Sequence, residues 1–166
     1  WIGWTAEQRR GRLNFLTQNR RFLILPDEAE PNLASRVLSL CERRLAADWS
    51  EAHGHPVLAV ETFVDPQRFM GTCYRAAGWK PLGLTAGARR VRRDWYDGGG
   101  TPKQLFVKPL AADAREQLRA EQWPEAWRRH VLPAKPAHLL RGEEHYSLFR
   151  ALLNLPDERN AHGRRH

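Results

Sequence analysis

The sequence predicts a protein of the α/β (α+β) class, in which helices flank one mixed sheet. The main observation is that short apolar runs of strand length alternate with segments whose apolar residues recur at helical spacing. The chain has 166 residues, of which 42% are hydrophobic and 28% charged, and this suits one domain with a core of its own plus a tail. No apolar run approaches the roughly 18–20 residues that cross a bilayer.

The first elements are a polar helix and a short strand. Thr5 and Gln8 have the spacing of a capping box, which predicts a helix over about residues 6–19. Residues 21–26 are apolar at their centre and predict a short strand that is buried on both faces.

A long helix and a second strand follow. Residues 33–49 carry an apolar stripe with steps of four, formed by Leu33, Val37, Cys41 and Leu45. Such a stripe predicts a helix that packs on a sheet. Residues 57–64 are the second strand, which Asp65 and Pro66 end.

The next segment predicts a helix, an edge strand and a loop. Residues 68–77 have helical spacing, and Gly78 stands where a left-handed C-cap is expected. Residues 79–85 form a third strand, which its proline and glycine place at an edge or a bulge. Residues 87–100 are a polar loop, basic at first and glycine-rich at its end.

A fourth strand at residues 104–110 and a charged helix at 111–122 complete the domain. Prolines then interrupt a strap that carries two tryptophans. Helical spacing returns only at residues 146–155, a helix too short to stand alone in water. We therefore expect a domain at 1–122, a linker or strap at 123–142 and the truncated start of a helical region at 143–166. The sequence does not begin with Met, so we expect trimming at that end too.

The charge of the chain favours a polyanionic partner. The net charge is +8 and the isoelectric point about 10.3, which favours nucleic acid first and an anionic membrane second. Two cysteines form no disulfide framework, and the N-terminus does not have the pattern of a signal peptide. We expect a cytoplasmic protein without a membrane partner.

A cluster of arginines is the strongest functional signal. Four arginines fall within five residues of the polar loop: Arg89, Arg90, Arg92 and Arg93. Guanidinium groups suit phosphate oxygens, and the adjacent Trp95 and Tyr96 can stack on unpaired bases. Lys103 would extend this DNA-binding surface. The alternative is a solvated loop in which the arginines pair partly with Asp94 and Asp97.

Glu61, Asp65 and Tyr74 are the candidate catalytic residues. Residues four apart on a strand share a face, so the two carboxylates would line one side of the sheet. Near Tyr74 they would act as a general base or hold a metal ion. The alternative, which the residue types favour, is that Glu61 pairs with Arg75 and Asp65 caps the following helix. No set of histidines and cysteines has the spacing of a metal site.

The order strand, helix, strand, helix, strand over residues 21–85 resembles the second half of the GNAT acetyltransferase fold. Residues 73–83, CYRAAGWKPLG, resemble the helix-to-strand element that this fold carries late. The resemblance implies an acyl-coenzyme A-dependent N-acyltransferase. The corresponding cofactor turn at residues 27–34 has no glycine, and it holds three carboxylates, those of Asp27, Glu28 and Glu30. These acids occupy the place of a pyrophosphate, so we expect no cofactor.

Several strings together resemble the Druantia DruA-like family over about residues 1–110. They are RFLILP at 21–26, PNLAS at 31–35, ETFVD at 61–65, RFMGTCYRAA at 68–77 and VKPL at 107–110. The resemblance implies a role in anti-phage defence, beside or fused to transposases. It implies no defined reaction.

The tail carries a second resemblance. YSLF at 146–149, LPDER at 155–159 and GRRH at 163–166 resemble the opening of the N-terminal region of H-repeat-associated, DDE-type transposases. The metal-binding carboxylates of such an enzyme would lie beyond residue 166.

Together these observations predict a bacterial mobile-element or anti-phage-defence protein that binds DNA through its basic loop. Partner proteins of a transposition or defence system are expected. Two alternatives stay open: an acyltransferase with an altered cofactor turn, and a non-catalytic interaction module.

Overall fold

The computed structural model describes residues 1–25, 27, 30–87, 89–92, 95–97 and 100–132. Its centre is a four-stranded sheet with the order β1-β2-β6-β3. β1 is parallel to β2, and the other two pairings are antiparallel. The sheet is therefore mixed, which confirms the predicted α/β class. Its strands are β1 (Leu16–Gln18), β2 (Ala59–Val64), β3 (Lys80–Leu84) and β6 (Gln104–Pro109).

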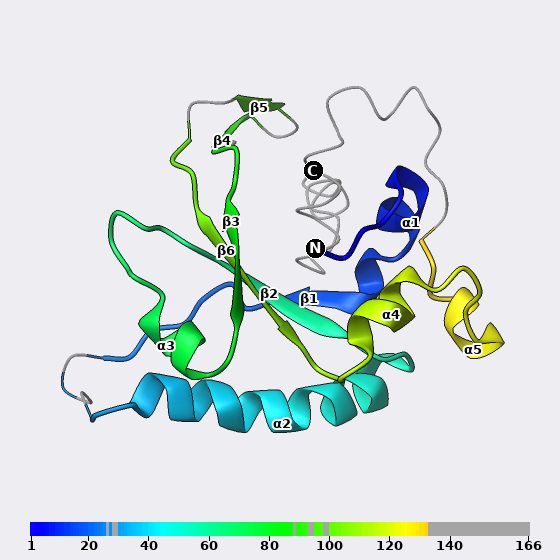
Figure 1. Ribbon diagram of the computed structural model, residues 1–166, viewed down its shortest axis with the longest axis horizontal. Helices are drawn as coiled ribbons and strands as arrows, with labels where there is room; N and C mark the ends of the chain where they lie inside the picture. The colour runs from blue at the N-terminus through cyan, green and yellow to red at the C-terminus, as the bar shows by residue number, and fades with distance from the viewer. Residues whose placement is uncertain (26, 28–29, 88, 93–94, 98–99, 133–166) are drawn as a thin grey trace, which may run out of the picture.

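Helices cover the sheet unequally. The long helix α2 (Leu33–His53) runs along one face, with the short α3 (Thr72–Ala76) beside it (Figure 1). Three further helices gather near one end of the sheet: α1 (Ala6–Gly11), α4 (Ala114–Arg119) and α5 (Glu125–Arg128). None of the described helices is long and apolar enough to cross a membrane.

The capping box at the start of α1 is confirmed, but the predicted length of this helix is wrong. The Gln8 N–H donates to the Thr5 hydroxyl at 3.1 Å, and the Thr5 N–H donates to the Gln8 side chain at 3.0 Å. The helix ends at Gly11, and a 3-10 turn, η1 (Leu13–Phe15), leads into β1. Leu13 and Phe15 are 2% and 0% exposed, so burial of these side chains in the core outweighs continuation of a polar helix.

The predicted strand at residues 21–26 is wrong. Its described residues belong to no strand, and Leu23 and Leu25 are 77% and 58% exposed. The parallel partner of β2 is instead the segment that begins at Leu16, which stands opposite Ala59. An apolar run indicates burial only where a sheet edge is free to receive it, and β1 occupies that edge.

The other predicted elements are present with different limits. α2 extends past the predicted end and stops at Gly54, which has a left-handed φ of 71°. Its stripe is narrower than expected, because Leu38 is buried while Cys41 is exposed. α3 begins four residues later than predicted, and Gly78 has the expected positive φ of 78°.

Two hydrophobic clusters lie on opposite faces of the sheet. One joins α2 and α3 to the sheet through Leu38, Val60, Tyr74 and Phe106, among others. The other joins Phe15, Ala59 and Val107 to α4 and Trp123. Trp123 lies at the start of the predicted strap, yet it is 6% exposed and meets the Phe15 ring edge-on at 4.2 Å.

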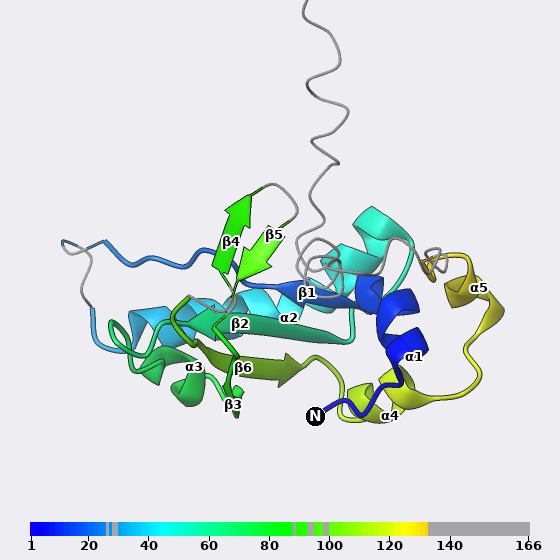
Figure 2. The ribbon, with the colours of Figure 1, turned by 90° about the horizontal axis from the view of Figure 1, so that it is seen from above.

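The predicted loop at residues 87–100 contains two strands. β4 (Arg89–Arg92) and β5 (Trp95–Asp97) form a separate antiparallel sheet. We call this sheet, with the segments that join it to β3 and β6, the arm. The arm stands off the side of the main sheet that is opposite α2 (Figures 1 and 2). The predicted helix at 146–155, and the second half of the strap, lie outside the described residues.

Candidate nucleic-acid interface

The arm grows directly out of two neighbouring strands. β3 continues into β4, and the chain returns from β5 into β6. At the base, the Thr85 N–H donates to the Lys103 carbonyl at 2.9 Å, and the Lys103 N–H donates to the Thr85 hydroxyl at 2.9 Å. These two bonds fasten the two legs of the arm where they leave the sheet.

Gly87 lets the two legs approach each other closely. It has a φ of 74°, and a Cβ atom there would collide with the Gly100 carbonyl and lie 3.1 Å from the Pro102 nitrogen. Only glycine fits both the conformation and the space. Gly87 and the two hydrogen bonds between Thr85 and Lys103 therefore hold the two legs together where the arm leaves the sheet.

The arm brings the predicted DNA-binding residues onto one ribbon. The backbone register sets Arg89 opposite Asp97, Arg90 opposite Tyr96 and Arg92 opposite Trp95. Lys103 is exposed on the returning leg, at the base. Arg93 lies outside the described residues. The cluster is thus part of a β-ribbon, which the sequence did not indicate because Arg89–Arg92 contains one apolar residue and no period-two pattern.

The structure places Tyr74 and Glu61 on opposite faces of the sheet. Tyr74 is 7% exposed and packs against Trp79 and Phe106 on the face that α2 covers. Asn19 donates to its hydroxyl at 3.4 Å, and burial raises the pKa of Tyr74. Val60 shares this face, whereas strand alternation places Glu61 on the other.

Asp65 ends β2 and shapes the turn that follows. Its side chain accepts a hydrogen bond from the Gln67 N–H at 3.0 Å, and its carbonyl accepts from the N–H groups of Arg68 and Phe69. This agrees with the capping alternative, although the capped segment is a turn and α3 starts only at Thr72.

Glu61 is held in an unusual environment. Its Oε1 atom is buried and has no hydrogen-bond partner among the described residues, and burial raises the pKa of Glu61 to about 7. Gln18, its register partner on β1, also has a buried Oε1 atom to which no described residue donates. Arg75, the predicted ion-pair partner, lies instead over the Phe106 ring at 5.2 Å. Glu61 can therefore gain or lose a proton near neutral pH. The sequence analysis did not predict that Gln18 lies opposite Glu61.

Fold and arm together define a class of protein: a small mixed α/β domain that presents a basic two-stranded arm. Among the described residues, no group of three histidine, cysteine or acidic side chains converges to hold a metal ion.

The sequence matches the family described as Druantia protein DruA over residues 1–94, more than half of the chain. The chain therefore belongs to the DruA family, and this associates it with anti-phage defence by the Druantia system. The match includes β4 and stops between the two strands of the arm. Comparisons with curated proteins and with solved structures gave no match. The resemblance to the GNAT fold stays a prediction, and one of the strands on which it rests, at 21–26, is not formed.

Proposed function

We propose that this DruA-family chain binds DNA as part of a defence system and that the arm makes the contact. The observation that carries the proposal is the placement of the arginine cluster on a ribbon that stands off the domain (Figure 2). The net charge of +8 gives the attraction a long-range component.

The geometry of the arm suits a duplex. The major groove of B-DNA admits a two-stranded β-ribbon, and arginine forks bind both phosphate oxygens and guanine edges. A two-stranded sheet is marginally stable alone, so contact with a duplex would also stabilise the arm.

Association with a transposase is a finer proposal, as are a cytoplasmic location and partner proteins of a defence or transposition system. The transposase association rests on the sequence of residues 146–166, which lie outside the described part of the chain.

A charge-reversed arm tests the proposal. Fluorescence anisotropy with a labelled duplex is expected to show binding by the parent chain. The triple variant R89E/R90E/R92E is expected to bind at least about 100-fold more weakly. The plot of log K against log salt should lose about 3 units of slope, at roughly 0.9 per phosphate contact.

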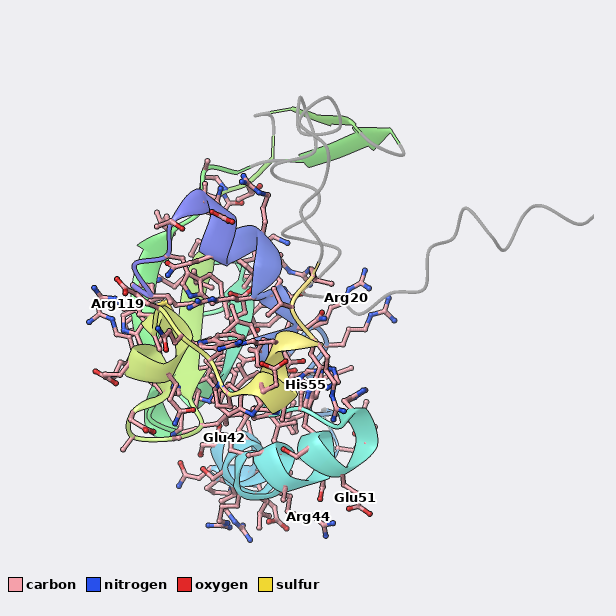
Figure 3. The ribbon with its side chains drawn as sticks, turned by 90° about the vertical axis from the view of Figure 1, so that its right-hand side faces the viewer. Arg20, Glu42, Arg44, Glu51, His55 and Arg119 are labelled. Carbon is pink, nitrogen blue, oxygen red and sulfur yellow. The ribbon has the colours of Figure 1, made fainter. Side chains whose placement is uncertain are left out.

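A matched control separates the arm from net charge. The variant R36E/R43E/R44E reverses three exposed arginines on α2, and either triple lowers the net charge from +8 by 6 to +2. Arg44 lies on the outer side of α2, far from the arm (Figure 3). The control is expected to stay within about threefold of the parent. Equal losses in both triples, or parent-like binding by the arm variant, would refute the proposal.

A further inference from the structure

A cavity of about 480 Å³ lies between α1, residues 121–123 and residues 128–132. Two of the elements that line it, α1 and α5, lie away from the arm (Figure 1). Its volume is in the range of small-molecule sites, about 300–1,000 Å³. Its charged lining residues are Arg10, Arg12, Arg128, Glu7 and Glu121.

Arg12 is fixed in this cavity without an ion-pair partner among the described residues. One guanidinium nitrogen donates to the Leu118 carbonyl at 2.7 Å, and the group lies over the Trp123 ring at 4.4 Å. Partial burial lowers the pKa of Arg12. A guanidinium held this way is preorganised for an anion.

The other two arginines add donors from both sides of the cavity. Arg10, on α1, forms no ion pair or hydrogen bond through its side chain with any described residue. Arg128, on α5, donates to the Trp123 carbonyl at 3.1 Å and pairs with Glu125 at 2.9 Å. Glu7 and Glu121 also line the cavity, but neither pairs with an arginine in the described chain. Glu125 balances the charge of Arg128, so Arg10 and Arg12 are the two lining cations that no carboxylate pairs with among the described residues.

We propose that this cavity binds a phosphate monoester, the group carried by a free nucleotide or by the 5′ end of a DNA strand. The guanidinium groups of Arg10 and Arg12 have donors that no carboxylate of the described residues accepts, and a phosphate monoester offers them three terminal oxygens and a charge near −2. The volume leaves room for the attached nucleoside. Arg12 supplies a fixed donor, and Arg10 and Arg128 complete the contact.

Isothermal titration calorimetry of the whole chain tests the site, with adenosine 5′-monophosphate as the probe. One binding event is expected with the nucleotide, and binding of adenosine should be at least tenfold weaker. The variant R10Q should weaken nucleotide binding about tenfold or more, the effect of one charge-assisted hydrogen bond. R10Q disturbs no contact of the fold, so loss of folding does not confuse the result.

Two further measurements separate the sources of phosphate and the two sites. In the R89E/R90E/R92E background, a short single strand with a 5′-phosphate is compared with the same strand without it. Preference for the phosphorylated strand over the free nucleotide assigns the site to DNA ends, and the reverse assigns it to nucleotides. Arg43→Gln on α2 should leave both affinities unchanged. The proposal is overturned if no phosphate monoester binds, if adenosine binds as well as its monophosphate, or if R10Q binds like the parent.

Discussion

Two glutamates on opposite faces of the sheet differ in whether the buried carboxylate has a hydrogen-bond partner. Glu42, on α2, accepts a hydrogen bond from the Trp79 ring nitrogen at 2.5 Å and pairs with Lys108 at 3.2 Å. Lys108 in turn donates to the Ala77 carbonyl at 2.6 Å. Glu61, on β2, has a buried oxygen with no hydrogen-bond partner.

The difference shows which face of the sheet is finished by the described chain. The face toward α2 is packed, and its buried carboxylate, that of Glu42, is paired. The opposite face is packed at one end by α4 and Trp123, and beyond that end the side-chain oxygens of Glu61 and Gln18 have no partner among the described residues. An unpaired buried polar group costs stability. Glu61 should therefore destabilise the fold, whereas the paired Glu42 should not.

The packed face should be the most sensitive to loss of volume. Phe106 is 0% exposed and lies against Tyr74 and the backbone of Gly71. We expect Phe106→Ala to lower the free energy of unfolding by about 3–5 kcal/mol, measured by urea denaturation. Phe69→Ala makes the same change at a ring that is 59% exposed and should stay within about 0.5 kcal/mol. Equal effects would contradict the burial of Phe106 in the core between the sheet, α2 and α3.

Glu61→Gln should raise the free energy of unfolding at high pH, because it removes the buried carboxylate from the face opposite α2. The folded pKa of about 7 exceeds the ordinary value, so the folded state holds a proton that the unfolded state releases first. The parent should therefore lose stability as pH rises from about 4.5 to 7, by about 3 kcal/mol in all. Glu61→Gln should remove this loss, gaining about 3 kcal/mol at pH 8.5 and almost nothing at pH 4. Parallel pH profiles for parent and variant would show that Glu61 ionises freely.

The sequence predicted the antiparallel part of the sheet well because its signals are local. β2 and β6 are rich in strand formers, the proline and glycine of β3 mark an edge strand, and the capping box at Thr5 depends on residues three apart. β1 could not be predicted, because its place depends on the parallel register of Leu16 with Ala59. That register is a property of the assembled sheet.

The candidate sites were predictable only as residue types. The arginine cluster is visible in the sequence, but its ribbon depends on how the segment between β3 and β6 pairs with itself. The pairing of Glu61 with Gln18 follows from the same parallel register as β1. The cavity arginines come from separate elements, which only the packing of Trp123 brings together.

Removal of the paired glutamate should be harmful where removal of the unpaired one is helpful. Glu42→Ala leaves the Trp79 ring nitrogen and Lys108 without their shared acceptor. We expect the free energy of unfolding to fall by about 2 kcal/mol. Glu51→Ala, on the outer side of the same helix (Figure 3), is the matched control and should change it by less than 0.5 kcal/mol. A harmless Glu42→Ala would remove the contrast between the two faces.

His55 should give the smallest effect and the opposite pH dependence to Glu61. Its ring is 9% exposed and lies near His130 and His53, at centroid distances of 4.6 and 6.1 Å. Burial and these two histidines lower the pKa of His55, so its contribution to stability is present above about pH 6.5 and is lost as pH falls.

The His55 effect should be measured in the Glu61→Gln background, where the larger titration is absent. There, stability should fall between pH 7 and 5, and His55→Gln should make that fall shallower. His53→Gln is the control, because His53 is exposed and its loss should alter the profile less. A steeper fall in the His55 variant would mean that the ring binds its proton more readily in the folded chain, contrary to its burial between α2 and α5.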